Sequence, residues 1–537
     1  MKGRGRDMAK RSFVAGAAIL SVAGLLGKFV GMFYRIWLVG LIGTEGAAFY
    51  QSPYALYSFL LVLSSAGLPT AISKMVSEQS ARGNPAAARL ILVKTRRILF
   101  FTGLAASLLM AALAGAAASA TGDPRSAPGF VALAPAIFFV CLMSAYRGYF
   151  QGMEDMAPTA LSQIVEQLGK VLFGFGLAIA LRPQGVIWGA VGAILGVTIS
   201  ELLGFACMFI KYLLHRRGSK DLNAEPGKPV ERLYARLFSI AIPITIGASA
   251  MPIVSIADAA LIQNRLQFLG YSVEQASRMY GAFTGMVIPI INMPAVITLA
   301  ISMALVPVMS GLQGSGDTAG LRRAAGTGLK LAFLFGSAAA VGLGLLAPQI
   351  IALLFRGSAE GAELLLGGQL LAVLSPAVFF LSVVQVTTGI LQGLGKPFQP
   401  VITLLLGIAL KIALNYILIG LPGVHVLGAA YSTIACYAVA AVGNLYFVLR
   451  STGLRLSLSA YILRPALAAG GMALAVWGLR FLGLSPLLST VLSVCAGVLV
   501  YGTLLLGLGG LSREDLSFVP GGARLIRLLS ALRLPIR

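Results

Sequence analysis

Charged side chains are scarce in this sequence. Only 11% of its 537 residues are Asp, Glu, Lys or Arg, whereas 58% are hydrophobic and the mean hydropathy is +0.89. An ordinary soluble domain carries about 25% charged residues. The composition therefore excludes a soluble globular protein of this length.

Residues that usually carry chemistry are also few. The two histidines, His215 and His425, are far apart in the sequence, and the four cysteines lie inside apolar runs without the spacing of metal ligands. We therefore expect no metal site and no disulfide framework. No Gly-x-x-x-x-Gly-Lys-Ser/Thr motif occurs, so we expect no ATP hydrolysis by this chain. These absences predict a protein that is not an enzyme, with no catalytic residues and no bound cofactor.

Long apolar runs dominate the chain instead. A run of about 18 or more apolar residues is long enough to cross the hydrocarbon core of a bilayer as a helix, and an outer-membrane barrel would show short alternating segments. The pattern predicts an all-α polytopic membrane protein with about fourteen transmembrane helices. The expected spans are 12–42, 50–76, 97–120, 130–152, 158–181, 187–214, 235–262, 281–309, 327–355, 366–391, 398–420, 425–450, 461–483 and 487–510.

The net charge of +23 is distributed unevenly between the two sides of these spans. Segments on the side of both termini carry 29 Lys and Arg residues, and the opposite connections carry six. The positive-inside rule then predicts that the N- and C-termini are cytoplasmic. We interpret the basic excess as a topology signal and a contact with lipid headgroups, not as a nucleic-acid site.

A motif that occurs twice divides the chain into two related lobes. An apolar helix, a short turn and a second apolar helix with a lysine about midway recur 241 residues later. Gly148, Gln151, Gly152 and Lys170 become Gly389, Gln392, Gly393 and Lys411. Self-similarity at such a distance indicates an internal duplication. We expect an N-lobe at 1–214, a cytoplasmic linker at 215–234, a C-lobe at 235–450, two further helices at 451–510 and a cytoplasmic amphipathic tail at 511–537.

Ionisable residues inside the spans are the candidate functional residues, because a charge in hydrocarbon is costly and is therefore a functional hypothesis by default. They are Lys28, Arg35, Arg147, Glu166, Lys170, Glu201, Asp258, Arg265 and Lys411.

Each of these residues also has a structural alternative. Glu166 and Lys170 are four residues apart and can neutralise each other on one helix face. Arg35 and Arg265 can snorkel to the outer interface. Arg147 is placed to contact headgroups at the cytoplasmic end of its span, and Glu201 can bond a neighbouring helix.

Four sequence features together resemble the two-lobe polysaccharide-flippase family. They are the Gly-x-x-Gln-Gly motifs at 148–152 and 389–393, the pattern Gly-Lys-Phe-Val-Gly-Met-Phe-Tyr-Arg at 27–35, the segment 258–265, and the tail Leu-Ser-Arg-Glu-Asp-Leu at 511–516. The sequence resembles the stage V sporulation protein B group of the multidrug/oligosaccharidyl-lipid/polysaccharide exporter superfamily. The MurJ-like lipid II flippases belong to the same superfamily.

The resemblance implies a transport function and a set of roles. Family members export undecaprenyl-diphosphate-linked saccharides, such as the peptidoglycan precursor lipid II, across the bacterial plasma membrane by alternating access. A cation gradient or the membrane potential supplies the energy. Helices 461–483 and 487–510 would then form a groove for the lipid tail, and the protein would act as a monomer, with the cell-wall synthesis machinery as a possible partner.

The candidate residues are given roles in such a transporter. Lys28 and Arg35 fall near the cavity arginines that MurJ-like members carry in the first helix, and they would bind the diphosphate. Lys170 and Lys411 are lobe-symmetric candidates for the same role, whereas we expect Glu166, Glu201 and Asp258 to be the cavity carboxylates that couple to a cation. Arg265 and Arg147 are further candidates. MurJ-like members carry an arginine in the eighth helix, but 281–309 contains no Lys or Arg.

Three other functions stay open on the sequence. An antiporter of organic cations from the same superfamily would need a cavity rich in carboxylates. A flippase for teichoic or capsular precursors differs only in its saccharide. A membrane glycosyltransferase would need acidic residues in sizeable outer loops, and the expected outer loops are short.

Overall fold

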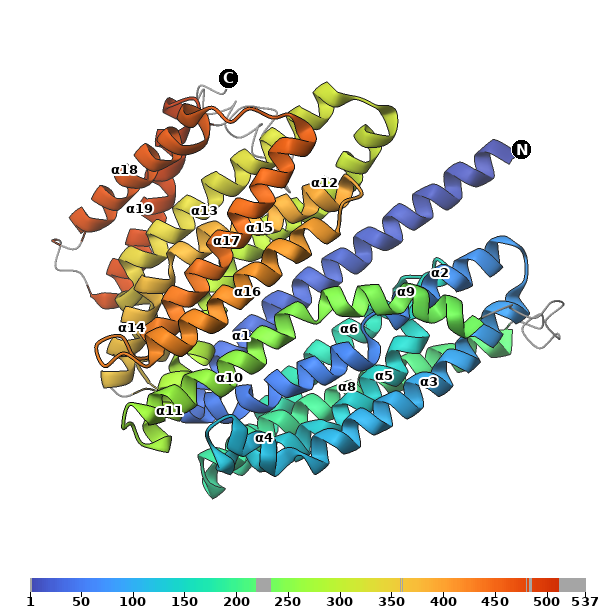
Figure 1. The fold of residues 1–537 in the computed structure, drawn as a ribbon, viewed down its shortest axis with the longest axis horizontal. Helices are drawn as coiled ribbons and strands as arrows, with labels where there is room; N and C mark the ends of the chain where they lie inside the picture. The colour runs from blue at the N-terminus through green and yellow to red at the C-terminus, as the bar shows by residue number, and fades with distance from the viewer. Residues whose placement is uncertain are drawn as a thin grey trace. The chain divides into compact units, whose positions relative to one another are not determined.

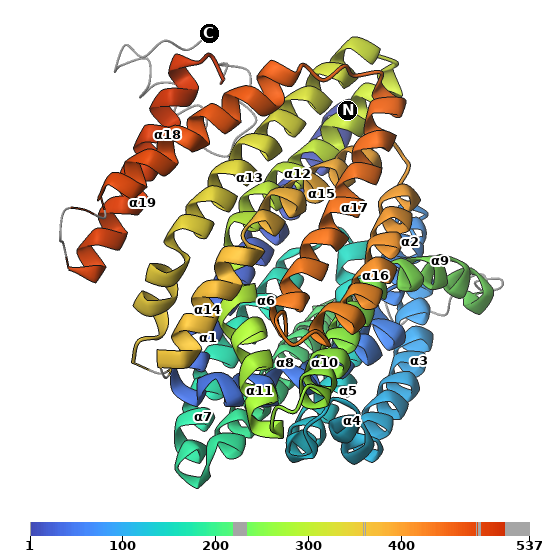
Figure 2. The same ribbon diagram turned by 60° about the vertical axis from the view of Figure 1, so that its left-hand side comes forward.

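The computed structural model describes residues 2–218, 233–357, 361–479 and 485–510, together with Ala359 and Phe481. Most of the expected linker and the whole tail 511–537 lie outside these residues. Every regular element within them is helical, and the expectation of an all-α fold is confirmed (Figure 1 and Figure 2).

Thirteen described helical segments are long and apolar enough to cross a membrane. The first of them, Phe29–Ala81, has 53 residues, and at about 1.5 Å per residue it exceeds one bilayer thickness more than twofold. The helix bends at Gly43, which has φ 72°, a conformation that glycine adopts without strain. Counted as two spans, this segment brings the total to the fourteen that the sequence predicts, and the chain is a multi-pass membrane protein.

The contacts divide the chain into two compact units, of which unit 1 comprises residues 1–267 and 271–281. Its longer helices are α1 (Lys2–Ser65), α2 (Leu68–Ala81), α3 (Pro85–Ala112), α5 (Ala127–Gly152), α6 (Ala157–Gly169), α8 (Val186–Gly218), α9 (Leu233–Ala248) and α10 (Ala250–Phe268), with the shorter α4 (Ala114–Ala120), α7 (Phe175–Leu181) and α11 (Val273–Gly281). Helix α5 packs against α1, α2, α3 and α8 and supplies much of the buried core of this unit.

Unit 2 comprises residues 268–270 and 282–537. Its helices are α12 (Ile288–Ser315), α13 (Thr318–Phe355), α14 (Gly361–Leu374), α15 (Pro376–Gly393), α16 (Phe398–Ile419), α17 (Leu427–Thr452), α18 (Arg464–Leu479) and α19 (Pro486–Gly507). Helices α18 and α19 lie side by side against α13 (Figure 2). The lobe boundaries drawn from the repeated motif stay a prediction, since the units follow packing and not ancestry.

The repeated motif has the same architecture in both copies. Four residues connect α5 to α6, and four connect α15 to α16. A methyl group on Gly148 would lie 2.7 Å from the Pro69 carbonyl oxygen of α2, and one on Gly389 would lie 2.4 Å from Ser302 Oγ of α12. Each repeated glycine therefore permits close approach of a neighbouring helix, which is the common use of small residues in membrane bundles.

Residues 263–280, which the expected spans 235–262 and 281–309 leave as a loop, are mostly helical. Helix α10 continues to Phe268 and α11 begins at Val273. Glu274 and Arg278 form an ion pair of 2.8 Å one turn apart in α11, so the polar residues that resemble a loop form the exposed face of a short amphipathic helix.

Candidate functional site

Four ionisable side chains from three neighbouring segments form a buried charge cluster in unit 1. Arg147 Nη2 of α5 lies 3.1 Å from Glu166 Oε2 of α6. Lys170 Nζ, which follows α6, lies 2.9 Å from Glu201 Oε1 of α8. We call Arg147, Glu166, Lys170 and Glu201 the unit 1 cluster. Burial of ions inside a bundle is expensive unless they are paired, and here both cations have a carboxylate partner.

The pairing differs from the one expected along the helix. Glu166 and Lys170 are four residues apart, but each forms its ion pair with a neighbouring helix and not with the other. Arg147 also donates from Nε and Nη2 to Ser162 Oγ, at 3.0 and 2.8 Å. Its side chain is 17% exposed, so the expectation of a headgroup arginine is wrong, whereas the bond from Glu201 to a neighbouring helix is confirmed.

The two carboxyl groups of the cluster also lie within hydrogen-bonding reach of each other. Two ionised carboxylates have no proton to donate, so a hydrogen bond between Glu166 and Glu201 requires that one of them is protonated. The cluster is therefore neutral when both glutamates are ionised and carries one positive charge when one is protonated. This arrangement can take up a proton or exchange it for another cation.

A local change in helix geometry coincides with the lysine. Residues Lys170–Gly174 form a π-helical turn between α6 and α7, and such turns occur frequently at functional sites. A methyl group on Gly174 would lie 2.3 Å from Tyr34 Oη of α1, and one on Gly204 would lie 2.8 Å from Glu166 Cγ. Glycines thus hold α1, the π-turn and α8 close around the cluster.

Aromatic residues of α1 lie beside Arg35, a cation outside the unit 1 cluster. The Arg35 guanidinium lies 5.9 Å from the ring centroid of Tyr54, and Tyr54 stacks on Tyr50 and contacts Tyr57 edge to face. Within the described part of the chain, Arg35 makes no hydrogen bond or ion pair. A cation over an aromatic face keeps its charge available to an anion.

The other predicted residues lie in different places. The side chain of Lys28 lies outside what the structure describes, although its backbone belongs to α1. Asp258 and Arg265 both lie on α10 in unit 1, and Asp258 interacts electrostatically with Tyr280 of α11. Lys411 is buried on α16 in unit 2, one turn before Asn415.

Neutral polar side chains of α16, before and after Lys411 in the sequence, form hydrogen bonds with α17. Asn415 Oδ1 accepts a short hydrogen bond from Ser432 Oγ of α17, and Asn444 Oδ1 accepts one from Thr403 Oγ1 of α16. No Asp or Glu occurs between residues 364 and 513. The second copy of the motif therefore buries its lysine without a carboxylate from α15, α16 or α17.

A further polar network in unit 1 was not predicted. Ser277 Oγ of α11 lies 2.8 Å from Asp123 Oδ2 and 2.9 Å from Gln263 Oε1 of α10. Arg125 pairs with Asp123 at 2.8 Å and with Glu45 of α1 at 3.1 Å. The signal available in the sequence was the Asp-Pro-Arg triplet at 123–125, where Asp accepts from a backbone N–H and caps the following turn.

Comparisons with known proteins cover nearly the whole chain. Residues 13–313, more than half of the sequence, match the family described as "Polysaccharide biosynthesis protein", and residues 278–417 match the MatE family. Stage V sporulation protein B of Bacillus subtilis (strain 168) is 25% identical over 97% of this chain and 100% of its own length. Lipid II flippase MurJ of the same organism is 24% identical over 82% of each chain.

Solved structures show the same fold. Lipid II flippase MurJ in an inward closed conformation superposes with a TM-score of 0.69 at 16% identity, covering 91% of this chain and 98% of that one. The family match, the relatives and the helical architecture agree. The chain therefore belongs to the polysaccharide biosynthesis protein family, within the multidrug/oligosaccharidyl-lipid/polysaccharide exporter superfamily.

Proposed function

We propose that this chain is a flippase that exports an undecaprenyl-diphosphate-linked saccharide, lipid II or a related cell-wall precursor, across the bacterial plasma membrane by alternating access. The observation that carries the proposal is Arg35, a cation within the first membrane-spanning segment that has no carboxylate partner among the described residues. Arg35 is half-buried, and a cation inside a membrane span without a counter-ion is costly unless an anionic ligand pairs with it. One of the relatives is a lipid II flippase, which supports a lipid-linked saccharide as the cargo.

The diphosphate is the recognition element in this proposal. Arg35, with Lys28 seven residues earlier on the same helix face, attracts the two negative charges of the substrate from the inner leaflet. Charge attraction is far stronger in a water-poor site than in bulk water. Lys170 and Lys411 are secondary candidates, and Lys170 would first have to leave Glu201. The lipid tail stays in the bilayer beside α18 and α19.

Coupling to an energy source is assigned to the unit 1 cluster. Entry of a proton or another cation between Glu166 and Glu201 makes the cluster more positive. This change alters the strength of the Lys170–Glu201 ion pair and the attraction of the cluster for the diphosphate. Movement of one elementary charge across the membrane potential supplies about 2.3 kcal/mol per 100 mV. Asp258 on α10 is the second coupling candidate. The termini are cytoplasmic and the protein works as a monomer in this proposal.

An organic-cation antiporter is the second candidate, and the buried carboxyl pair is the observation that favours it. Glu166 and Glu201 would then hold the organic cation itself. Arg147 and Lys170 already neutralise both carboxylates, and Arg35 adds a further positive charge. An organic cation would be repelled by this charge balance, so the anionic substrate is preferred.

The test is native mass spectrometry of the purified protein with lipid II. We expect wild type to retain lipid II and the double variant Lys28→Ala/Arg35→Ala to lose it by about a hundredfold, because each charge-assisted contact contributes about 1.5 kcal/mol or more. Arg216→Ala/Arg217→Ala is the matched control, since both arginines are exposed at the end of α8 and removal changes the net charge equally. Equal retention by both double variants would contradict the assignment of the diphosphate to α1.

A further inference from the structure

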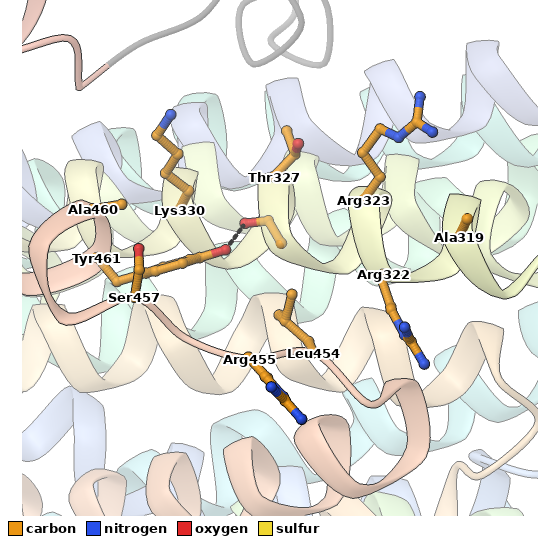
Figure 3. Close-up of a pocket in the computed structure, with 11 residues that line it drawn as sticks. Ala319, Arg322, Arg323, Thr327, Lys330, Leu454, Arg455, Ser457, Ala460 and Tyr461 are labelled. Atoms are coloured by element: carbon orange, nitrogen blue, oxygen red, sulfur yellow. Dashed lines mark hydrogen bonds between the residues drawn. The ribbon is translucent and has the colours of Figure 1, made fainter.

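Unit 2 contains a cavity that the proposed transport route does not use. It has a volume of about 530 Å³ and lies between the first three turns of α13 and the segment that connects α17 to α18. Figure 3 shows its lining, which comes from residues 319–330 on one side and 454–461 on the other. All of these residues belong to unit 2.

The lining is strongly cationic. Arg322, Arg323, Lys330 and Arg455 line the cavity, and no acidic residue is among its lining residues. In Figure 3, Arg322 and Arg455 extend in the same direction from two segments, whereas Arg323 and Lys330 extend to the other side of α13. Within the described residues, Arg323 and Arg455 make no hydrogen bond or ion pair. The cavity thus contains guanidinium groups that are available to bind an anion.

Hydrogen bonds fix the shape of the cavity. Arg322 Nε donates to the Thr452 carbonyl oxygen at 3.0 Å, which fastens the end of α17 to α13. Gly453 follows with φ 66°, and a methyl group there would lie 3.1 Å from Arg322 Nη2. Tyr461 Oη donates to the Gly326 carbonyl oxygen at 3.2 Å across the cavity floor. These two hydrogen bonds tie the two sides of the cavity together.

Apolar side chains adjoin this cationic cavity. Tyr461 lies in the π-helical turn Ser459–Leu463, in which Ile462 and Leu463 are 52% and 54% exposed, and the preceding Leu458 is 72% exposed. Both α13 and the 459–479 segment are membrane-spanning candidates that begin here, and tyrosine is enriched at the membrane interface. A ligand in this place meets cations at its polar end and apolar surface beyond it, which is the pattern of an anionic lipid.

We propose that this cavity binds the phosphate-bearing headgroup of an anionic phospholipid of the surrounding bilayer. Arg455, beside Arg322, supplies the available cation, Arg323 and Lys330 add to the positive potential around the cavity, and the exposed leucine and isoleucine side chains contact the acyl chains. Basic pockets between membrane helices bind such headgroups by charge attraction. The site needs neither a saccharide nor transport, so it stands apart from the proposed flippase activity.

Lipid retention tests this site. The full-length protein is placed in nanodiscs of phosphatidylcholine with a minority of phosphatidylglycerol, transferred to detergent and analysed by native mass spectrometry. We expect wild type to keep phosphatidylglycerol in preference, and Arg323→Gln/Arg455→Gln to keep about tenfold less. Both arginines are exposed and without partners, so folding should be unchanged. The control Arg216→Gln/Arg217→Gln should resemble wild type.

Competition experiments distinguish a bound phospholipid from other phosphate-bearing ligands. Undecaprenyl diphosphate and inorganic phosphate are each added as competitors. Retention of phosphatidylglycerol in the presence of inorganic phosphate supports a lipid site with acyl-chain contacts. Equal retention by wild type and the Arg323/Arg455 variant, displacement by inorganic phosphate alone, or retention of undecaprenyl diphosphate without phosphatidylglycerol would each overturn the proposal. Lipid II binding by the same variant is measured alongside, and we expect it to be unchanged.

Discussion

The two copies of the repeated motif keep the same packing but differ in chemistry. In unit 1, Lys170 pairs with the carboxylate of Glu201 on α8. In unit 2, Lys411 lies one turn from Asn415, whose amide oxygen accepts from Ser432 of α17. Packing is conserved because the glycines of both motifs admit a neighbouring helix. The charge partners diverged, so only the first copy has carboxyl groups that can bind and release a cation.

The largest decrease in Tm is expected for a substitution that leaves one charge of the first copy unpaired. Glu201→Ala leaves the Lys170 ammonium buried without its partner, and loss of one member of a buried ion pair costs about 3–5 kcal/mol. Thermal unfolding of the purified protein in detergent should show a large decrease in Tm. The double variant Lys170→Met/Glu201→Leu should recover most of it, because neither charge then remains.

The corresponding substitution in unit 2 tests whether the two buried lysines differ in their charge partners. Lys411→Met leaves no buried carboxylate uncompensated in α15, α16 or α17, so its Tm should decrease by much less than that of Glu201→Ala. A decrease as large as that of Glu201→Ala would mean that the two lysines play the same electrostatic role, and the contrast drawn here between the copies would be wrong.

Substitution of the repeated glycines should have similar effects in both units. Gly148→Ala and Gly389→Ala each force a methyl group against a neighbouring helix, and overpacking costs about 1–3 kcal/mol. Gly176→Ala and Gly470→Ala are matched controls with open space around the added methyl. Unfolding midpoints of the four variants provide the comparison. If Gly389→Ala behaved like its control, close approach of α12 would not depend on that glycine.

The smallest expected effect concerns the neutral network. Ser432→Ala removes the donor to Asn415, and a neutral hydrogen bond contributes about 0.5–1.5 kcal/mol. The midpoint should shift slightly, and lipid II retention should match that of wild type. Loss of retention as large as that of Lys28→Ala/Arg35→Ala would place the main binding residues in the second copy and would contradict the assignment of the diphosphate to α1.

The sequence predicted the fold well because the bilayer imposes a simple length rule. Apolar runs identify spans directly, and only details depended on tertiary structure. The backbone at Gly43 is not helical and separates α1 into two helices that meet at a kink, and α11 was missed because Glu274 and Arg278 make it polar.

The candidate site was predicted less completely. The ionisable residues, including Glu166 and Glu201, could be identified because a charged side chain in the hydrocarbon core has a high free-energy cost. Their partners could not be predicted, because Arg147 reaches Glu166 only after α5 and α6 fold back on each other. The neutral network around Lys411 carries no such cost signal, since Asn, Ser and Thr are common in apolar helices.

Transport itself is the most direct test of the account. Fluorescent lipid II is placed in proteoliposomes, and quenching from outside reports how much reaches the outer leaflet with and without a proton or sodium gradient. We expect gradient-dependent flipping by wild type and its loss in Lys28→Ala/Arg35→Ala. Glu166→Gln/Glu201→Gln should lose the gradient dependence, and Ser432→Ala should keep both flipping and its gradient dependence. Flipping that persists in the Lys28/Arg35 variant would contradict it.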